Sequence, residues 1–296
     1  MRNRHVLITG GSSGIGLALA RQCDAAGARL SLIARDPAKL AAAAASLRAN
    51  ATAPTSAPSA SSTPSASAAP SESSTPSKIV TASADVSDAP SVLAAIRAAE
   101  SVHGPVDILI TSAGIARPGH FAELPAAIHE RTMAVNYFGT LYAIQAVVPS
   151  MRARRTGSIV ILSSGAGLVG LFGYTAYAPS KFALRGLAES LRGELAPDNV
   201  SVTIVYPPDT DTPQLVEENL TKPAETRALT AAAGLWTADA VARATLDGLR
   251  RRRFAVTPGL QLTALGWLHS LIAPLLRRSF DRTVARVRRD APSQHP

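Results

Sequence analysis

Short apolar runs alternate with longer amphipathic segments along most of the chain. Six of these runs have the length and composition of buried strands, at residues 5–9, 29–34, 78–84, 106–111, 157–164 and 200–206. Helical spacing of apolar residues follows at about 14–26, up to residue 47, at 90–102, around 126–152 and in the segment that carries Lys181. Strands that are apolar on both faces and alternate with helices are typical of a parallel sheet covered on both sides. We therefore expect an α/β fold with one doubly wound parallel sheet.

Two segments depart from this pattern. Residues 49–77 are almost entirely Ala, Ser, Thr and Pro, a composition that cannot build a packed core, so we expect a disordered insertion there. Residues 260–296 begin with an apolar stretch and continue into a basic tail. We therefore expect a single domain over residues 1–259 and a C-terminal helical extension over residues 260–296.

Composition narrows the class of protein. The chain has 296 residues, 46% of them hydrophobic, which is enough for one large core. Cys23 is the only cysteine, which excludes an internal disulfide. The chain enters its first apolar run directly, so we expect neither a signal segment nor an N-terminal membrane span.

The net charge of +9 is unevenly distributed, because ten arginines lie between Arg250 and Arg289. Such a cluster is typical of a solvated surface, of attachment to an anionic membrane or of a nucleic-acid site. His, Cys and Asp residues form no cluster with the spacing of metal ligands, so we expect no metal.

A glycine-rich turn connects the first strand to the first helix. In "ITGGSSGIG" (residues 8–16), Gly10 permits a tight turn, Gly14 lets the backbone approach a ligand and Gly16 lets the helix pack on the sheet. The helix then offers free N–H groups and the positive end of its dipole to a pyrophosphate. We therefore expect a dinucleotide site formed by Gly10, Ser12, Ser13, Gly14, Ile15 and Gly16.

Residues at the ends of the next two strands indicate which dinucleotide binds. Arg35 follows the second strand and Lys39 lies one helical turn further on; with the hydroxyl of Ser12, these cations suit a ribose 2′-phosphate. This favours NADPH over NADH, although Asp36 is placed to reach an unphosphorylated ribose. Asp85 closes the third strand and is the expected partner of the adenine amino group, with capping of the next helix as its alternative.

The segment "SSGAGLVGLFGYTAYAPSK" (residues 163–181) holds the side chains expected to do the chemistry. Tyr177 and Lys181 are four residues apart, so on a helix they lie on one face. The Lys181 ammonium is expected to lower the pKa of the Tyr177 phenol. A tyrosine tuned in this way donates a proton to a carbonyl oxygen as a hydride arrives. Tyr174 has Ala178 at the same offset and therefore lacks such a partner.

Ser164 is the expected partner of Tyr177 at the carbonyl oxygen. It ends a strand at the carboxyl edge of the sheet, where doubly wound sheets bind ligands. The side chain of Ser163 points to the opposite face of that strand. We expect both serines near the substrate, with Ser164 as the catalytic one.

The glycine turn, "TSAG" (residues 111–114) and the Ser-Tyr-Lys set together resemble the short-chain dehydrogenase/reductase family over about residues 4–259. The resemblance implies a Rossmann fold, and its serine-to-tyrosine spacing of about thirteen residues pairs Ser164 with Tyr177. It also implies that Asn136, in "MAVNYFGT", holds a water of a proton relay to the lysine. Further contacts to the cofactor are implied for Val86, Ala113, Gly114, Pro207, Thr210 and Thr212, together with Tyr177 and Lys181.

A narrower resemblance is to the 3-ketodihydrosphingosine reductases, also called 3-dehydrosphinganine reductases. It is carried by "GLFGYTAYAPSKFALRGLAESL" and by "YPPDTDTPQLVEENLTKPAETR", in which a second proline replaces the usual glycine after the sixth strand. It implies NADPH-dependent reduction of the 3-keto group of a long-chain amino alcohol, 3-ketosphinganine, with Thr210 and Thr212 over the nicotinamide and phosphates. Phe172 and Tyr174 are then expected to line the wall that faces the lipid, with a core position as the alternative for Phe172.

Two other functions stay open on the sequence. One is an NADP-dependent reductase of another hydrophobic ketone, such as a steroid or a 3-ketoacyl chain. The other is a non-catalytic regulator that binds NADPH, against which the intact set of Ser164, Tyr177, Lys181 and Asn136 argues.

The C-terminal extension is a candidate for membrane attachment. Residues 260–276 make a stretch of 17 residues, at the short limit for crossing a bilayer, and Gly266, His269 and Pro274 disfavour a span. Trp267 and the flanking arginines suit a helix that lies in the membrane interface. The alternative is packing against the core or against a second subunit, which would make a homo-oligomer.

The lipid substrate implied by the resemblance favours the membrane. Eukaryotic members of the resembled subgroup are membrane-bound, with active sites that face the cytosol. We therefore expect peripheral or monotopic attachment through residues 260–289, no segment that crosses the bilayer and no nucleic-acid partner. The expected location is the cytoplasm, at the cytosolic face of the endoplasmic reticulum in a eukaryote or at the inner membrane in a bacterium.

Overall fold

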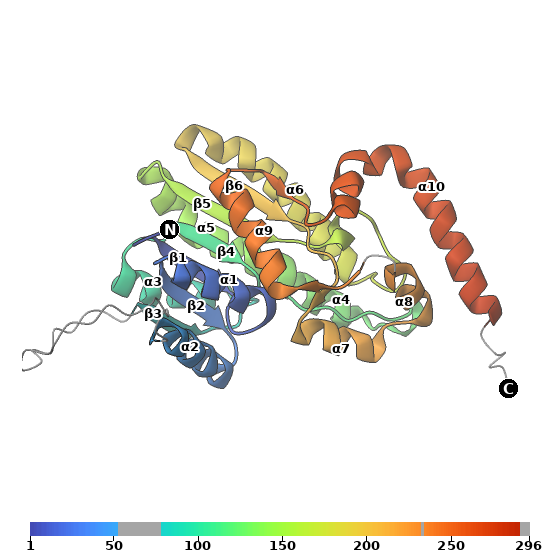
Figure 1. The fold of residues 1–296 in the computed structure, drawn as a ribbon, viewed down its shortest axis with the longest axis horizontal. Coiled ribbons are helices and arrows are strands. Elements are labelled where there is room, and N and C mark those ends of the chain that lie inside the picture. The colour runs from blue at the N-terminus through green and yellow to red at the C-terminus, as the bar shows by residue number, and fades with distance from the viewer. Residues whose placement is uncertain (53–77, 232–233, 291–296) are drawn as a thin grey trace, which may run out of the picture.

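The computed structural model describes residues 1–52, 78–231 and 234–290, whose fold is shown in Figure 1. Most of the expected insertion, residues 53–77, lies outside the described residues. Its first residues, 49–52, instead form the end of helix α2, which runs from Pro37 to Thr52. The alanine-rich sequence before them favours continuation of the helix.

A sheet of seven parallel strands forms the centre of the molecule, in the order β3-β2-β1-β4-β5-β6-β9. The chain order reverses between β1 and β4, and doubly wound sheets bind ligands outside the carboxyl ends of such strands. The predicted doubly wound sheet is confirmed. The strands are β1 (His5–Thr9), β2 (Arg29–Ala34), β3 (Ile79–Ser83), β4 (Ile108–Thr111), β5 (Gly157–Leu162), β6 (Val200–Val205) and β9 (Ala255–Val256).

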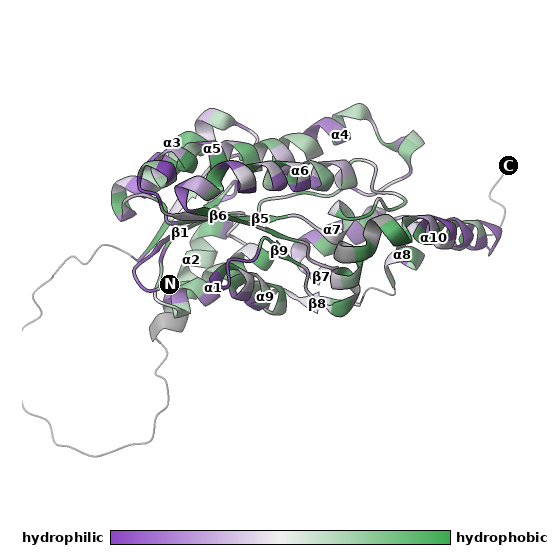
Figure 2. Cartoon of the chain, turned by 90° about the horizontal axis from the view of Figure 1, so that it is seen from above, coloured by the Kyte–Doolittle hydropathy of each residue, from purple (hydrophilic) through white to green (hydrophobic). Residues whose placement is uncertain are grey.

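Helices cover both faces of the sheet, as Figure 2 shows. One face carries α3 (Ala89–His103), α5 (Gly139–Ala153) and α6 (Tyr177–Leu195), and the other carries α1 (Gly14–Ala25), α2 and α9 (Ala238–Arg250). Successive side chains of a strand point to opposite faces. In β1, the side chain of Leu7 packs in the core on the side of α3, α5 and α6. Those of Val6 and Ile8 pack in the core on the side of α1, α2 and α9. Continuous apolar strands in the sequence therefore reflect burial on both sides.

The long helix expected at residues 126–152 contains a wider turn. Helix α4 (Ala126–Met133) continues through a π-helical turn at Ala134–Phe138 into α5. Such turns often occur at functional sites. This one carries Asn136, whose environment is described below.

The chain after β6 forms elements that the apolar pattern did not predict. Strand β7 (Thr210–Asp211) pairs with β8 (Trp236–Thr237), and between them lie α7 (Pro213–Thr221) and α8 (Ala224–Thr230). The Thr212 hydroxyl caps α7 by accepting a hydrogen bond from the backbone N–H of Leu215 at 3.3 Å, and proline occupies the first helical position. Both features are helix start signals.

Helix α10 (Leu260–Asp290) extends well beyond the apolar stretch that predicted it. Phe280, Val284 and Val287 recur at helical spacing and are half-buried, which explains the continuation. The helix lies beside α8 at the edge of the molecule (Figure 1), and Arg288 Nε is 3.2 Å from Glu225 Oε1. The side chains of Trp267 and His269, and residues 291–296, lie outside the described residues.

Within the parts of the chain that the structure describes, no helix combines the length and the apolar character needed to cross a membrane. The division of the chain at residue 259 stays a prediction.

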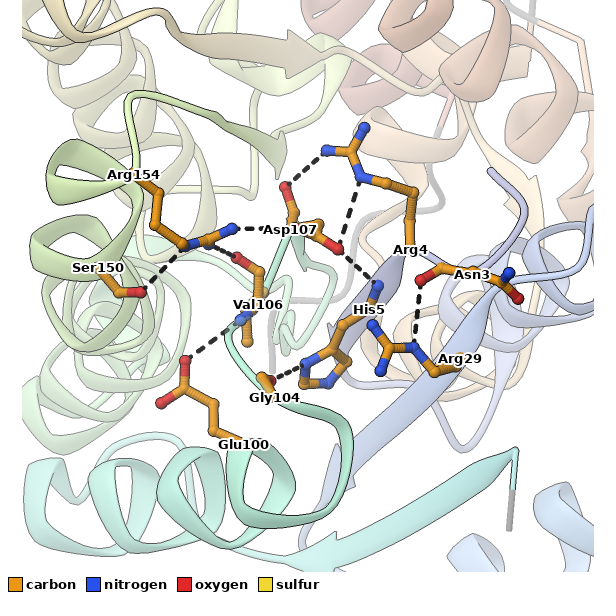
Figure 3. Close-up of polar contacts among 10 residues, drawn as sticks. All are labelled: Asn3, Arg4, His5, Arg29, Glu100, Gly104, Val106, Asp107, Ser150 and Arg154. Atoms are coloured by element: carbon orange, nitrogen blue, oxygen red, sulfur yellow. Dashed lines mark hydrogen bonds and ion pairs between the residues drawn. The ribbon is translucent and has the colours of Figure 1, made fainter. Parts of the chain in front are cut away.

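The amino edge of the sheet is closed by a polar network around Asp107, shown in Figure 3. Its carboxylate accepts a hydrogen bond from the His5 backbone N–H at 2.9 Å and pairs with Arg4 at 3.6 Å and Arg154 at 3.1 Å. Burial lowers the pKa of the His5 imidazole to about 4, and its Nδ1 lies 2.7 Å from Gly104 O. The polar network at this edge therefore holds β1 and β4 together. The cavity described below lies at the opposite, carboxyl edge of the sheet.

Candidate active site

Loops at the carboxyl edge of the sheet enclose a cavity of about 570 Å³. The cavity joins the expected cofactor and carbonyl ends of the site. Of the residues predicted for the site, those that line it are Gly10, Ser12, Ser13, Gly14, Ile15, Arg35, Lys39, Val86, Ala113, Gly114, Ser163, Ser164, Tyr174, Tyr177, Lys181, Pro207, Thr210 and Thr212. Four others are absent from the lining as the structure describes it: Gly16, Asp85, Asn136 and Phe172.

The glycine turn has the geometry of an anion cradle. Gly10 has a φ of +71°, and a Cβ there would lie 2.6 Å from the backbone nitrogen of Ala113. A Cβ on Gly16 would collide with the carbonyl oxygen of Gly10, so the turn requires glycine at both positions. Ser13 precedes α1 without a capping side-chain bond, which leaves the N–H groups of the first helical turn for a ligand. These features fit the pyrophosphate of a dinucleotide.

Arg35 and Lys39 both line the cavity and are exposed. Asp36, the competing ribose ligand, is already engaged. Its Oδ1 accepts hydrogen bonds from the backbone N–H groups of Ala38 at 2.9 Å and Lys39 at 3.1 Å, in the first turn of α2. One oxygen of this carboxylate therefore caps α2, and Asp36 lines the cavity beside the two cations, which suit an anion.

Asp85 has a different partner from the expected adenine amino group. Its Oδ2 lies 2.9 Å from Arg131 Nη2, and its Oδ1 accepts hydrogen bonds from the N–H and hydroxyl of Ser87. Partial burial acts to raise the pKa of this carboxyl, but the hydrogen bonds from Arg131 and Ser87 hold it at about 2. Asp88, not Asp85, caps α3 by accepting from Ser91 N at 3.0 Å. This geometry does not support the adenine contact.

Helix α6 places Tyr177 and Lys181 on one face, and both side chains are buried. Lys181 Nζ lies 5.5 Å from the centre of the Tyr177 ring and donates a hydrogen bond to Leu162 O at 3.0 Å. Since Leu162 ends β5, this bond ties the lysine to the carboxyl edge of the sheet. A Cβ on Gly114 would lie 3.6 Å from Lys181 Nζ, so the glycine leaves the ammonium accessible from the cavity.

Burial, rather than Lys181, controls the pKa of the Tyr177 phenol. Burial and the charge of Glu218 raise this pKa, and hydrogen bonding with Ser164 and Gln214 opposes the rise without cancelling it. Burial also lowers the pKa of Lys181 from 10.5 to about 8. The expectation that Lys181 lowers the pKa of Tyr177 is therefore wrong for this structure, because a phenolate is costly in a buried site. Tyr177 carries its proton at neutral pH.

The two serines have different surroundings. Ser164 Oγ accepts a hydrogen bond from Ala166 N at 3.2 Å and hydrogen-bonds with Tyr177. The buried Ser163 hydroxyl donates to the carbonyl oxygen of Lys181 at 3.1 Å. Ser163 therefore fixes α6 against β5, and its expected place near the substrate stays a prediction, whereas Ser164 is the serine whose hydroxyl is placed with Tyr177.

Asn136 positions the loop that follows β4. Its Nδ2 donates to Ile115 O at 3.0 Å and Ser180 Oγ at 2.9 Å, and its Oδ1 accepts from Ile115 N at 2.8 Å. The fully buried side chain thus joins the π-helical turn, the loop and α6. The water relay implied for Asn136 stays a prediction.

Thr210 and Thr212 bring the start of α7 against the glycine turn. Their hydroxyls donate within the segment, Thr210 Oγ1 to Pro208 O at 2.8 Å and Thr212 Oγ1 to Thr210 O at 3.1 Å. A Cβ on Gly14 would lie 3.1 Å from the Thr212 methyl carbon. The predicted placement of both threonines near the cofactor end agrees with this arrangement.

Glu218 is the principal site residue that the sequence analysis missed. It lies in α7, lines the cavity and is 7% exposed. Its Oε2 accepts a hydrogen bond from the Tyr174 hydroxyl at 2.8 Å, and its Oε1 accepts one from Gln214 Nε2 at 2.9 Å. Gln214 and Glu218 are one turn apart, so recognition of α7 from its threonine cap would have put both on one face.

Phe172 does not join Tyr174 in the cavity lining. Its ring packs edge-on against His120, with ring centres 5.6 Å apart, and the Arg288 guanidinium lies 5.5 Å from its centre. Phe172 therefore holds the end of α10, contrary to its expected place on the lipid-facing wall. Apolar side chains of α10 line the cavity instead, namely Leu262, Leu265 and Phe280.

The arrangement suits the reduction of a carbonyl group. At one end, the glycine turn and two cations suit a polyanion. At the other, the hydroxyl-bearing side chains of Ser164 and Tyr177 both line the cavity and interact with each other, and Lys181 lies behind the tyrosine. The walls between them are largely apolar, which suits a hydrocarbon chain and excludes water.

Comparisons with known proteins agree with this chemistry. A family model described as short chain dehydrogenase matches residues 4–58 and 58–223. The 3-dehydrosphinganine reductase of Danio rerio is 37% identical, in an alignment that covers 97% of this chain and 87% of the relative. The 3-ketodihydrosphingosine reductase of Mus musculus is 37% identical, with 95% and 86% covered. Among solved structures, levodione reductase has a TM-score of 0.73 and 25% identity, covering 89% of this chain and 99% of its own.

Proposed function

The chain belongs to the short chain dehydrogenase family, and from this we propose that it reduces the 3-keto group of 3-ketosphinganine to sphinganine with NADPH. The observation that carries the proposal is the set of the half-buried Ser164 and the buried Tyr177 and Lys181, which lines a cavity that continues to the glycine turn. The substrate is supported by relatives, named for this reaction, that align with nearly the whole chain.

Each residue of the set has a defined task. NADPH, when bound, supplies the hydride that adds to the carbonyl carbon. The Tyr177 O–H bond breaks as its proton moves to the carbonyl oxygen, which completes the alcohol. Ser164 donates a hydrogen bond to the same oxygen and polarises the ketone. Lys181 lies behind the ring and lines the cavity, where its ammonium is placed to bind the nicotinamide ribose, and a solvent proton later replaces the one that Tyr177 transfers.

NADPH is preferred to NADH because the ribose end of the site is cationic. Arg35 and Lys39 line the cavity there, and the Asp36 Oδ1 is occupied by the backbone of α2. A 2′-phosphate meets two positive charges, whereas the carboxylate that an unphosphorylated ribose would need already accepts two backbone hydrogen bonds through its Oδ1.

Arg35→Asp is expected to raise the KM for NADPH about 10- to 100-fold and to lower the KM for NADH, because it replaces the phosphate partner with a carboxylate. The steady-state KM values of both cofactors measure this. Arg97→Asp makes the same charge change at an exposed position of α3 and serves as the control. An unchanged NADPH:NADH preference in Arg35→Asp would show that Arg35 does not contact the phosphate.

Peripheral membrane attachment through α10 is also part of the proposal. The side chains of Leu268, Leu271 and Leu275 are 45%, 78% and 65% exposed and recur at helical spacing. Exposed arginines follow them at positions 277, 278, 282 and 286. Apolar side chains beside cations suit a helix that lies on an anionic membrane surface. On the inner side, Leu262, Leu265 and Phe280 reach the cavity, so the same helix is placed to admit a lipid.

Replacing Leu268, Leu271 and Leu275 together with serine is expected to abolish flotation of the protein with anionic liposomes, because the apolar anchor is lost while the arginines remain. The matched control replaces Leu93 and Val102, two exposed apolar residues of α3, with serine and is expected to float like the wild type. Equal flotation of the α10 variant and the wild type, or no flotation of the wild type, would contradict attachment through α10.

A panel of ketones tests the reaction itself. With purified protein, NADPH oxidation is expected with 3-ketosphinganine and not with steroid ketones or 3-ketoacyl thioesters. Turnover of a steroid without turnover of 3-ketosphinganine would favour the reductase of another hydrophobic ketone. Binding of NADPH without turnover of any ketone would favour the regulator.

A further inference from the structure

The catalytic cavity contains a buried carboxylate for which the reaction described so far has no use. Glu218 is 7% exposed and lines the cavity beside the proton donor. Across the described residues, no Lys, Arg or His forms an ion pair with it. Its contacts are the neutral Tyr174 hydroxyl at 2.8 Å and the Gln214 amide at 2.9 Å. A buried charge without an opposite charge is costly, and a cationic ligand would offset that cost.

The cations near Glu218 are engaged elsewhere. Lys222 is buried and pairs with Asp209, with 3.5 Å between Nζ and Oδ2. Lys181 Nζ donates to Leu162 O at 3.0 Å. The charge of Glu218 raises the pKa of Lys181, but no ion pair joins the two side chains among the described residues, so Glu218 is able to take a cationic ligand at the catalytic end of the cavity.

Glu218 lies within one side chain of the reacting group. The Tyr174 hydroxyl binds it, and the Tyr174 and Tyr177 ring centres are 5.5 Å apart. A substrate whose carbonyl oxygen accepts the proton of Tyr177 therefore occupies the part of the cavity that Glu218 lines. Aromatic rings beside a carboxylate form a favourable environment for an ammonium group.

On the basis of the proposed function, we infer that Glu218 binds the protonated amine next to the ketone of the substrate and selects α-amino ketones over other long-chain ketones. In 3-ketosphinganine the amine is carried by the carbon bonded to the carbonyl carbon. The Glu218 carboxylate would therefore bind the amine, which is the group that distinguishes this substrate from a steroid or a 3-ketoacyl chain. A ketone without an amine leaves the buried Glu218 without an ion-pair partner, which disfavours its binding relative to the amino ketone.

Amine binding also assists the proton transfer. The charge of Glu218 raises the pKa of Tyr177 and so holds its proton more tightly. An ammonium group beside Glu218 neutralises this charge and lowers the pKa of Tyr177 again. The substrate thereby makes its own proton donor more acidic.

The test compares 3-ketosphinganine with its desamino analogue, in which hydrogen replaces the amine. Wild-type protein is expected to prefer the amino ketone in kcat/KM. Glu218→Gln keeps the shape and removes the charge; kcat/KM for the amino ketone is expected to fall about 10- to 100-fold, mainly through KM. For the desamino ketone kcat/KM is expected to stay equal or rise. Glu218→Asp retains the charge and is expected to restore part of the discrimination.

Glu217→Gln is the matched control, since it makes the same change at an exposed neighbour in α7 and is expected to behave as wild type. NADPH affinity and the thermal midpoint monitor folding of all variants. An equal loss on both ketones in Glu218→Gln would assign Glu218 a structural role and overturn the inference. A wild-type enzyme that reduces both ketones equally well would overturn it too, while leaving the proposed reductase activity intact. A wild-type enzyme inactive on both would overturn the proposed function along with it.

Discussion

Tyr177→Phe is expected to lower kcat about 10³-fold, in the range that general acids contribute. The variant loses the proton donor and changes little volume in a buried site, so the cavity and its cofactor end are retained. NADPH affinity, measured by fluorescence titration, should therefore stay near that of the wild type. The decisive readout is steady-state reduction of 3-ketosphinganine at saturating NADPH.

Tyr174→Phe provides the comparison, because it removes a hydroxyl from a neighbouring ring of the same cavity. That hydroxyl donates to Glu218 at 2.8 Å, so its loss should raise the KM for the amino ketone and spare most of kcat. Near-normal turnover in Tyr177→Phe, with loss of kcat in Tyr174→Phe, would identify Tyr174 as the acid.

Lys181→Met is expected to lower kcat/KM for NADPH about 100-fold, since a buried ammonium of the site is replaced by an uncharged chain of similar length. The wild type should also show a pH dependence that this variant lacks. Burial lowers the pKa of Lys181 to about 8. Below that pH the ammonium is present, and above it the charge is lost, so kcat/KM for NADPH falls as pH rises through about 8.

Lys181→Arg retains a positive charge across this range and separates charge from shape. It is expected to recover part of the NADPH affinity and to remove the fall above pH 8, since arginine does not lose its proton there. A wild-type profile that stays flat from pH 7 to 9.5, or a Lys181→Met variant with the wild-type profile, would contradict the assignment.

The apolar pattern predicted the sheet because each strand is buried on both faces. This apolar pattern is absent where helices or strands are short or mostly polar. Helices α7 and α8 were missed because each spans fewer than three full turns, and most of their residues are polar. The π-helical turn at Ala134–Phe138 was missed because it interrupts neither the helix nor its apolar spacing. A helical extension was expected over residues 260–296, and α10 occupies Leu260–Asp290 of it.

The site residues that were predicted correctly are placed by the local sequence, and those that were missed depend on contacts with distant segments of the chain. Tyr177 and Lys181 were found because helical periodicity alone places them together. The role of Asp85 could not be predicted, since its partner Arg131 is 46 residues away in the sequence. The pKa of Tyr177 depends on burial and on Glu218, which is brought to the site by the packing of α7. Phe172 was misplaced because Arg288 contacts it from the far end of α10.

The most direct measurement follows cofactor and product in a single reaction of the purified protein with NADPH and 3-ketosphinganine. NADPH oxidation is read from absorbance, and sphinganine is identified by mass spectrometry against a standard. We expect one sphinganine for each NADPH oxidised, and about 10³-fold less of both product and oxidation with Tyr177→Phe over the same period. NADPH oxidation without sphinganine, or sphinganine formation by Tyr177→Phe at near the wild-type rate, would contradict this function.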